Sequence, residues 1–180
     1  SNSASERKTP SLKKGKDGEV TSAQFDHSEI TPDAITTLQK HRNLKELTFF
    51  ECPRLDQKVI DQLVSLKSLE SLYFVRCPIN DDDIQSMGKL SQIKMLALTH
   101  TKVTKKGIAS LENWKKLNCL TIGIGFTAET LTPLPKLTNL TCLELRFKSA
   151  RISQLKGLGN LSNLETLRIY DADITDDDLA

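Results

Sequence analysis

The sequence predicts an α/β repeat solenoid with one parallel sheet of about seven strands on one face and helical or irregular segments on the other. Three observations support this prediction. The 180-residue chain repeats itself at about 24 residues from Gly18 onward. Each unit opens with the alternating apolar pattern of a half-buried strand and continues with the apolar spacing of a helical turn. A single unit could not bury its apolar edge alone, whereas stacked units share one continuous core.

Residues 1–17 precede the repeats. They hold five basic and two acidic side chains and almost no apolar ones, so we expect a flexible basic leader there. Residues 18–180 are predicted to form the repeat domain, with seven units of which the last is incomplete. The units start at Gly18, Arg42, Lys67, Ser91, Lys115, Thr138 and Ser162.

The predicted strand of each unit carries apolar residues at the third, sixth and eighth places, for example Leu44, Leu47 and Phe49. We expect these places to face the core, where they stack into columns from one unit to the next. Because side chains alternate along a strand, the fifth, seventh and ninth places should face outward.

The returning segments are predicted to change along the chain. In most units an apolar residue is followed by others five and eight positions later, as in Val103, Ile108 and Leu111, which predicts a helical segment in units one to four. Two prolines and two glycines interrupt this pattern in units five and six. We therefore expect Pro133–Lys136 and Lys156–Gly159 to be irregular or to form a single tight turn.

The fifth strand ends in "GIGF" and is one residue short. Gly123 and Gly125 permit unusual backbone angles at this point. The pattern predicts a shallow notch in the outer sheet face at Gly123, flanked by Thr99 and Arg146.

Two acidic runs, Asp81–Asp83 and Asp176–Asp178, open the returning segments of their units. Asn80 and Thr175 precede them and are good N-cap residues, and carboxylates in a first helical turn are favourable near the positive end of the helix dipole. We interpret both runs as solvated helix starts. A divalent-metal site is the alternative, and the different directions of adjacent carboxylates on a helix count against it.

The repeated core resembles the leucine-rich repeat pattern L-x-x-L-x-L-x-x-[N/C]-x-L, with Cys52 and Cys77 at the N/C place. The segments "CPIND" and "VTKKGIASL" are similar to the cysteine-containing repeats of F-box substrate adaptors and to bacterial repeats of this length. The other units have no Asn or Cys at the N/C place, so an Asn ladder is not expected. The resemblance covers residues 18–180. It implies a right-handed, horseshoe-shaped solenoid whose concave face is the parallel sheet and whose convex face carries the helical segments.

The histidines do not indicate catalysis. His27 and His100 share the tenth place of their units but are separated by three strands, and His41 falls at an inter-unit place that is otherwise apolar. No phosphate loop, dinucleotide fingerprint, nucleophile elbow or metalloprotease motif occurs. We therefore predict a chain that is not an enzyme and has no catalytic residue and no cofactor.

The four cysteines do not form a predicted metal site. Cys52 and Cys77 fall at an inward place, whereas Cys119 and Cys142 fall at the outward fifth place, so the four thiols cannot converge on one zinc ion. Cys119 and Cys142 should be neighbours on adjacent strands, where parallel Cβ vectors make a disulfide awkward. Free thiols are expected, which favours an intracellular, reducing compartment.

The charge balance and hydropathy restrict the kinds of partner. The net charge is +2, and the leader accounts for more than this excess, so the repeats are close to neutral. A neutral body is a poor match for nucleic acid. No run of eighteen apolar residues occurs, so no membrane span is expected.

The concave face is the predicted functional surface, because packing occupies the inward places. One part of it is apolar and the other is charged with an aromatic residue, which is the composition of a protein-recognition patch. The predicted binding residues are Glu46, Phe50, Tyr73, Val75, Met95, Glu144, Arg146, Arg168 and Tyr170.

A non-enzymatic protein-protein interaction module is therefore the first functional hypothesis. One alternative is the recognition part of a larger enzyme or adaptor, such as a ubiquitin-ligase substrate adaptor or a bacterial effector. Another is a receptor-like domain for a small ligand or glycan.

The seventh unit lacks most of its returning segment, although it has full core residues such as Leu164, Leu167 and Ile169. A terminal unit of this kind leaves an apolar column without a neighbour. We expect this edge to be covered either by further chain beyond Ala180 or by end-to-end self-association with another copy.

Overall fold

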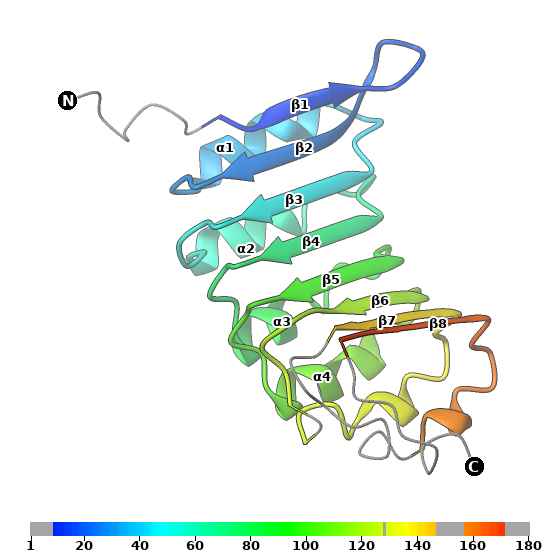
Figure 1. Cartoon of the computed structure of the whole chain (residues 1–180). Helices are drawn as coiled ribbons and strands as arrows, with labels where there is room; N and C mark the ends of the chain where they lie inside the picture. Colours follow the sequence, from blue (N-terminus) through cyan, green and yellow to red (C-terminus); the bar gives the residue numbers. More distant parts are fainter. Residues whose placement is uncertain (1–8, 128, 147–156, 172–180) are drawn as a thin grey trace.

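The computed structural model describes residues 9–127, 129–146 and 157–171. These residues form one sheet of eight strands in sequence order, β1 to β8, with helical segments behind one face (Figure 1). Strands β2 to β8 are parallel, as predicted. The strands are β1 (Ser11–Lys14), β2 (Val20–Asp26), β3 (Glu46–Phe50), β4 (Ser71–Val75), β5 (Met95–Thr99), β6 (Cys119–Ile122), β7 (Cys142–Arg146) and β8 (Thr166–Tyr170).

The returning segments are α-helical in the first four units, as predicted. The described parts of the fifth and sixth returning segments form 3-10 turns, as predicted for Pro133–Lys136 and for residues 157–159, while Lys156 lies outside the described residues. The α-helices are α1 (Pro32–Thr36), α2 (Gln57–Leu63), α3 (Asp81–Met87) and α4 (Lys105–Ser110). The 3-10 turns are η1 (Thr37–Lys40), η2 (Leu111–Asn113), η3 (Leu134–Lys136) and η5 (Leu158–Asn160). Pro135 lies within the short turn η3, because its missing amide donor prevents regular α-helix there.

The predicted flexible leader is wrong for its last part. Ser11–Lys14 form β1, which pairs antiparallel with β2 and widens the sheet by one strand. A tight turn joins the two strands, since the N–H of Gly15 donates to the carbonyl of Glu19 at 2.8 Å and Gly18 has a positive φ of 82°. The polar strand needs little burial because it lies at an edge, where lysines also discourage pairing with other chains.

The core consists of the predicted columns. Leu47, Leu72 and Leu96 are direct neighbours on adjacent strands and have no exposed surface. At the eighth place, Phe49 stacks on Phe25 and on the next phenylalanine along the array, with ring centroids 5.5 and 5.2 Å apart. Each fully buried side chain of this size contributes about 1.5–3 kcal/mol relative to an exposed one. Each unit is therefore stabilised by the equivalent side chains of the units on either side of it.

The acidic run Asp81–Asp83 opens a helix, as predicted, but it is not solvated throughout, because Asp82 is exposed whereas Asp83 is only 4% exposed. The side chain of Asn80 accepts hydrogen bonds from the backbone N–H groups of Asp82 and Asp83, and Asp83 accepts one from the N–H of Asn80 at 2.9 Å. Asp82 pairs with Lys106 at 3.3 Å, while Asp81 binds backbone groups of the next unit. The three carboxylates thus have three different sets of partners, and the run Asp176–Asp178 lies outside the described residues.

The notch predicted at Gly123 is absent. Gly123 is buried, and an added Cβ there would lie 2.3 Å from the Thr99 hydroxyl oxygen and 2.7 Å from the Thr99 Cβ. The side chain of Thr99, on the neighbouring strand, fills the space where a notch was expected. The glycine therefore permits close packing between two units, and the strand of the fifth unit ends one residue early, at Ile122.

The last described strand has an uncovered edge, as predicted. Leu167 is 46% exposed, whereas its column neighbour Leu143 on β7 is completely buried. Leu164 and Ile169 are only partly buried. The apolar column thus loses its cover at β8.

Candidate functional site

The concave face is built by three rows of outward side chains, because the strands are paired in register. The fifth place gives one row along the sheet, the seventh a second and the ninth a third. Strands in a sheet are about 4.8 Å apart, so row neighbours on adjacent strands can touch. The predicted binding residues fall into two clusters within these rows.

The apolar cluster comprises Phe50, Tyr73, Val75 and Met95, on β3 to β5. Phe50 and Val75 are direct ninth-place neighbours, and the Tyr73 hydroxyl donates to the Met95 sulfur at 2.8 Å. All four side chains are half-buried on the open side of the sheet. Glu46 flanks this cluster at the start of β3, next to Ser71. The cluster is therefore an ordered apolar surface with a polar border.

Burial raises the pKa of the Tyr73 hydroxyl above its usual value, and the nearby Glu46 carboxylate acts in the same direction. The phenol therefore stays neutral at physiological pH and keeps its hydrogen bond to the Met95 sulfur. A half-buried tyrosine with a polar tip is a common anchor in protein interfaces.

The charged cluster comprises Glu144, Arg146, Arg168 and Tyr170, on β7 and β8. The Arg146 guanidinium lies 4.5 Å from the centre of the Tyr170 ring, and its Nε and Nη2 atoms each lie 3.0 Å from a Glu144 oxygen. Glu144 is also the direct neighbour of Arg168 on the adjacent strand. The clamp by Glu144 and Tyr170 fixes the orientation of Arg146, so its charge is presented in one direction.

The strip between the clusters is small and polar. Cys119 and Cys142 are fifth-place neighbours and both are free thiols, as predicted. Burial, followed by the hydrogen bond to Cys142, raises the pKa of the Cys119 thiol to about 12. This thiol is therefore not activated as a nucleophile.

One ordered feature of this surface was missed from the sequence, a line of left-handed residues at the tenth place. His27, Glu51, Arg76, His100 and Asp171 have positive φ angles between 47° and 58°. The backbone N–H of each of the first four donates to a carbonyl of the next unit, at 2.8–2.9 Å. The first three acceptors are the last residues of β3, β4 and β5, and the fourth, Ile124, lies just beyond β6. The unfavourable left-handed angle is thus offset by one more inter-unit hydrogen bond.

The tenth-place side chains form a charged border along the apolar cluster. Glu51 pairs with His27 at 3.1 Å and with Arg76 at 2.5 Å. The His27 ring also meets Phe50 edge-on, with centroids 5.6 Å apart. The signal was present in the sequence, since these residues share one repeat place, but histidine, glutamate and arginine do not signal a left-handed angle as glycine does.

Among the described residues, the histidines and the two buried cysteines do not gather into one site. His27 and His100 lie at the ends of strands β2 and β5, three strands apart, and His41 is partly buried between units. Cys52 and Cys77 are buried, with sulfur atoms about 3.4 Å from the carbonyl oxygens of Phe25 and Phe49. Within the described residues, no group of three His, Cys, Asp or Glu side chains could hold a metal ion.

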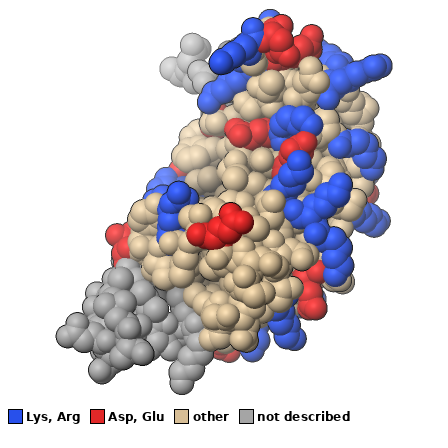
Figure 2. Space-filling view, turned by 90° about the vertical axis from the view of Figure 1, so that its right-hand side faces the viewer, with Lys and Arg blue, Asp and Glu red and all other residues tan. Residues whose placement is uncertain are grey.

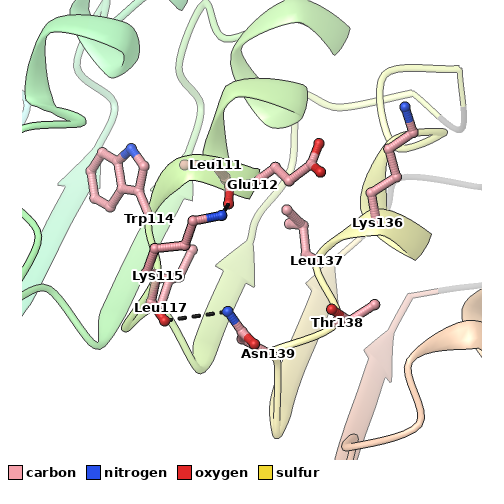
Figure 3. A pocket seen from close by; sticks show the side chains of 9 residues that line it. All are labelled: Leu111, Glu112, Trp114, Lys115, Leu117, Lys136, Leu137, Thr138 and Asn139. Atoms are coloured by element: carbon pink, nitrogen blue, oxygen red, sulfur yellow. Dashed lines mark hydrogen bonds between the residues drawn. The ribbon is translucent and has the colours of Figure 1, made fainter.

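Two hollows of about 340 Å³ each lie at the opposite rim, where returning segments lead into the next strand. Figure 3 shows one of them, with Lys115 and Lys136 on two sides and the Glu112 carboxylate between them. Leucines such as Leu117 and Leu137 also line it. The second hollow has a similar lining, with Leu38 and Leu66 beside basic side chains.

No helix in the described part of the chain is long and apolar enough to cross a bilayer.

Known structures resemble this fold, whereas no family model and no curated protein matches the sequence. The chain is similar to an internalin (inlF) from Listeria monocytogenes, with a TM-score of 0.50 and 24% identity over 78% of this chain and 45% of that one. It is also similar to the Arabidopsis receptor kinase HAESA, solved in complex with the peptide hormone IDA and the co-receptor SERK1. That match has a TM-score of 0.52 and 18% identity over 89% of this chain and 27% of that one. The chain thus spans less than half of either matched structure, and the likeness concerns the fold.

Proposed function

Since the chain folds as a leucine-rich repeat solenoid, we propose that it is a non-enzymatic protein-protein interaction module that binds its partner on the concave face. The observation that carries this proposal is the pair of ordered clusters on one open sheet face. The apolar cluster offers an anchor surface around Tyr73 and Phe50, and the charged cluster offers a fixed guanidinium at Arg146.

The separation of the concave face into an apolar cluster and a charged cluster supports a protein partner. Interfaces place aromatic and aliphatic anchors at the centre and charged groups at the rim, and tyrosine and arginine are enriched among their strongest contacts. Three strand steps separate β4 from β7, or about 14 Å, so one partner of ordinary size can reach both clusters. The complex that HAESA forms with a peptide hormone and a co-receptor is compatible with this kind of ligand.

The test compares binding and folding in the same set of variants. Phe50→Ala, Tyr73→Ala and Arg146→Ala should each weaken capture of the partner in pull-downs, while thermal melts stay close to the parent protein. Lys102→Ala, at an exposed position after β5, is the matched surface control and should leave both unchanged. Capture that is insensitive to all three concave substitutions would contradict the proposal.

A further inference from the structure

The rim where returning segments lead into the next strand is strongly basic. We call it the basic edge and define it as residues 39–45, 64–70, 88–94, 112–118, 136–141 and 160–165. Figure 2 shows that Lys and Arg side chains gather along this side of the molecule. Its basic residues are Lys40, Arg42, Lys45, Lys67, Lys89, Lys94, Lys115, Lys116 and Lys136, and its acidic residues are Glu70, Glu112 and Glu165.

Internal contacts account for four of the nine basic side chains. Lys45 and Lys94 both pair with Glu70, at 2.6 and 2.9 Å. Lys67 and Lys115 donate to carbonyl oxygens at the ends of the preceding turns, at 2.8 and 3.0 Å. These contacts stabilise the returning segments, since cations are favourable at helix C-termini.

Five basic side chains have no such role. Lys40, Arg42, Lys89, Lys116 and Lys136 are exposed, and none makes an ion pair or side-chain hydrogen bond with another described residue. Like charges gathered on one rim repel one another and lower stability unless a counter-charge is present. The internal structure therefore does not explain this cluster.

We propose that the basic edge binds an acidic segment of a partner protein, laid along the rim across successive units. The unpaired side chains of Arg42, Lys89, Lys116 and Lys136 supply the positive charge. The two hollows, which open on this rim near Arg42 and Lys136, receive side chains of the same segment. This second surface lies beside the concave face and does not depend on the two clusters there.

The composition of the edge favours a protein segment over nucleic acid. Binding of single strands relies on exposed aromatic rings for base stacking. The one aromatic ring of the edge besides His41 is Trp114, which is 2% exposed. Eight of the nine cations are lysines, which act as mobile point charges, whereas arginine is preferred where phosphate is bound in a fixed geometry.

The test uses a fluorescein-labelled peptide of four Glu-Glu-Leu repeats, with fluorescence anisotropy read at several salt concentrations. The edge variant combines Arg42→Gln, Lys89→Gln, Lys116→Gln and Lys136→Gln. The control variant combines Arg54→Gln, Lys58→Gln, Lys102→Gln and Lys105→Gln, which removes the same number of exposed arginine and lysine charges from the opposite rim. Thermal melts establish that both variants are folded.

We expect the edge variant to bind the peptide at least tenfold more weakly than the parent protein, and the control variant to stay within about twofold. The parent's affinity should fall with salt more steeply than that of the edge variant.

Equal losses in the two variants, or no binding at physiological ionic strength, would overturn the proposal. Tighter binding of heparin or of oligothymidylate of similar charge, lost in the same edge variant, would overturn the assignment to a protein segment. Tyr73→Ala should leave peptide binding intact, so the test of the basic edge is independent of the function proposed for the concave face.

Discussion

The carboxylate of Asp81 accepts a 2.9 Å hydrogen bond from the backbone N–H of Gly107, which lies in the next unit of the array. The same oxygen accepts from the N–H of Thr104 at 2.7 Å, and the second oxygen receives the Thr104 hydroxyl. One side chain thus caps the start of the neighbouring helix α4 and joins two units. Gly107 has no room for a side chain, because an added Cβ would lie 2.4 Å from the Asp81 oxygen and 2.6 Å from a Val103 methyl group.

Asp81→Ala should lower the free energy of unfolding by about 1–2 kcal/mol, the usual loss for a removed helix cap. Gly107→Ala should lower it by about 1–3 kcal/mol through overpacking. Because both changes disturb the same contact, the double variant should lose less than the two single losses added together. Urea unfolding of the four proteins measures this, and simple additivity would show that the contact does not couple the units.

Leu72→Ala and Tyr73→Ala test the assignment of inward and outward side chains. Leu72 has no exposed surface, so its truncation should cost about 2–5 kcal/mol. Tyr73, one residue later, faces the open side of the sheet, so its truncation should cost clearly less stability. Thermal melts compare the two. A loss in Tyr73→Ala as large as in Leu72→Ala would mean that this side chain belongs to the core.

Gly123→Ala should destabilise the protein by about 1–3 kcal/mol, because the new methyl group would overlap the Thr99 side chain. The matched control is Gly159→Ala, in η5, where an added Cβ would meet nothing within 4 Å. That change should be neutral or slightly stabilising, since alanine has fewer unfolded conformations to lose. Chemical denaturation separates the two outcomes, and equal effects would contradict the packing seen at Gly123.

The ion pairs of Glu70 predict an acid-dependent contribution to stability. Hydrogen bonds from Lys45 and Lys94 lower the pKa of this carboxyl from 4.5 to about 2 in the folded state. A lowered folded pKa means that the contribution is complete above the unfolded value and disappears as pH falls toward 2. Glu70→Gln should therefore be less stable than the parent near pH 6, and the difference should shrink between pH 4.5 and 2.

High salt should also reduce the difference between Glu70→Gln and the parent, because these side chains are largely exposed and salt screens them. Denaturant midpoints measured across pH at two salt concentrations check both trends. A difference that stays constant down to pH 2 would show that Glu70 acts through packing and not through its charge.

The inward columns could be predicted from the sequence because each repeats at the same place in every unit, and Leu47, Leu72 and Leu96 are indeed direct neighbours. The concave residues followed from the same register. Gly123 was misjudged because the group that fills its space, Thr99, comes from another unit. The strand Ser11–Lys14 was missed because an exposed edge strand needs no apolar pattern. The basic edge was hidden by the net charge, since acidic residues such as Asp81–Asp83 on the opposite rim offset it.

The sheet order has a mechanical consequence. All seven parallel strands, β2 to β8, stack in sequence order along one axis, so a load applied between β2 and β8 pulls across the strands and not along them. Hydrogen bonds loaded in this direction open one after another, as in a zipper, and each unit contacts only its neighbours. The array should therefore extend stepwise at low force, beginning at β8, where Leu167 is 46% exposed and less tightly packed than its buried neighbour Leu143.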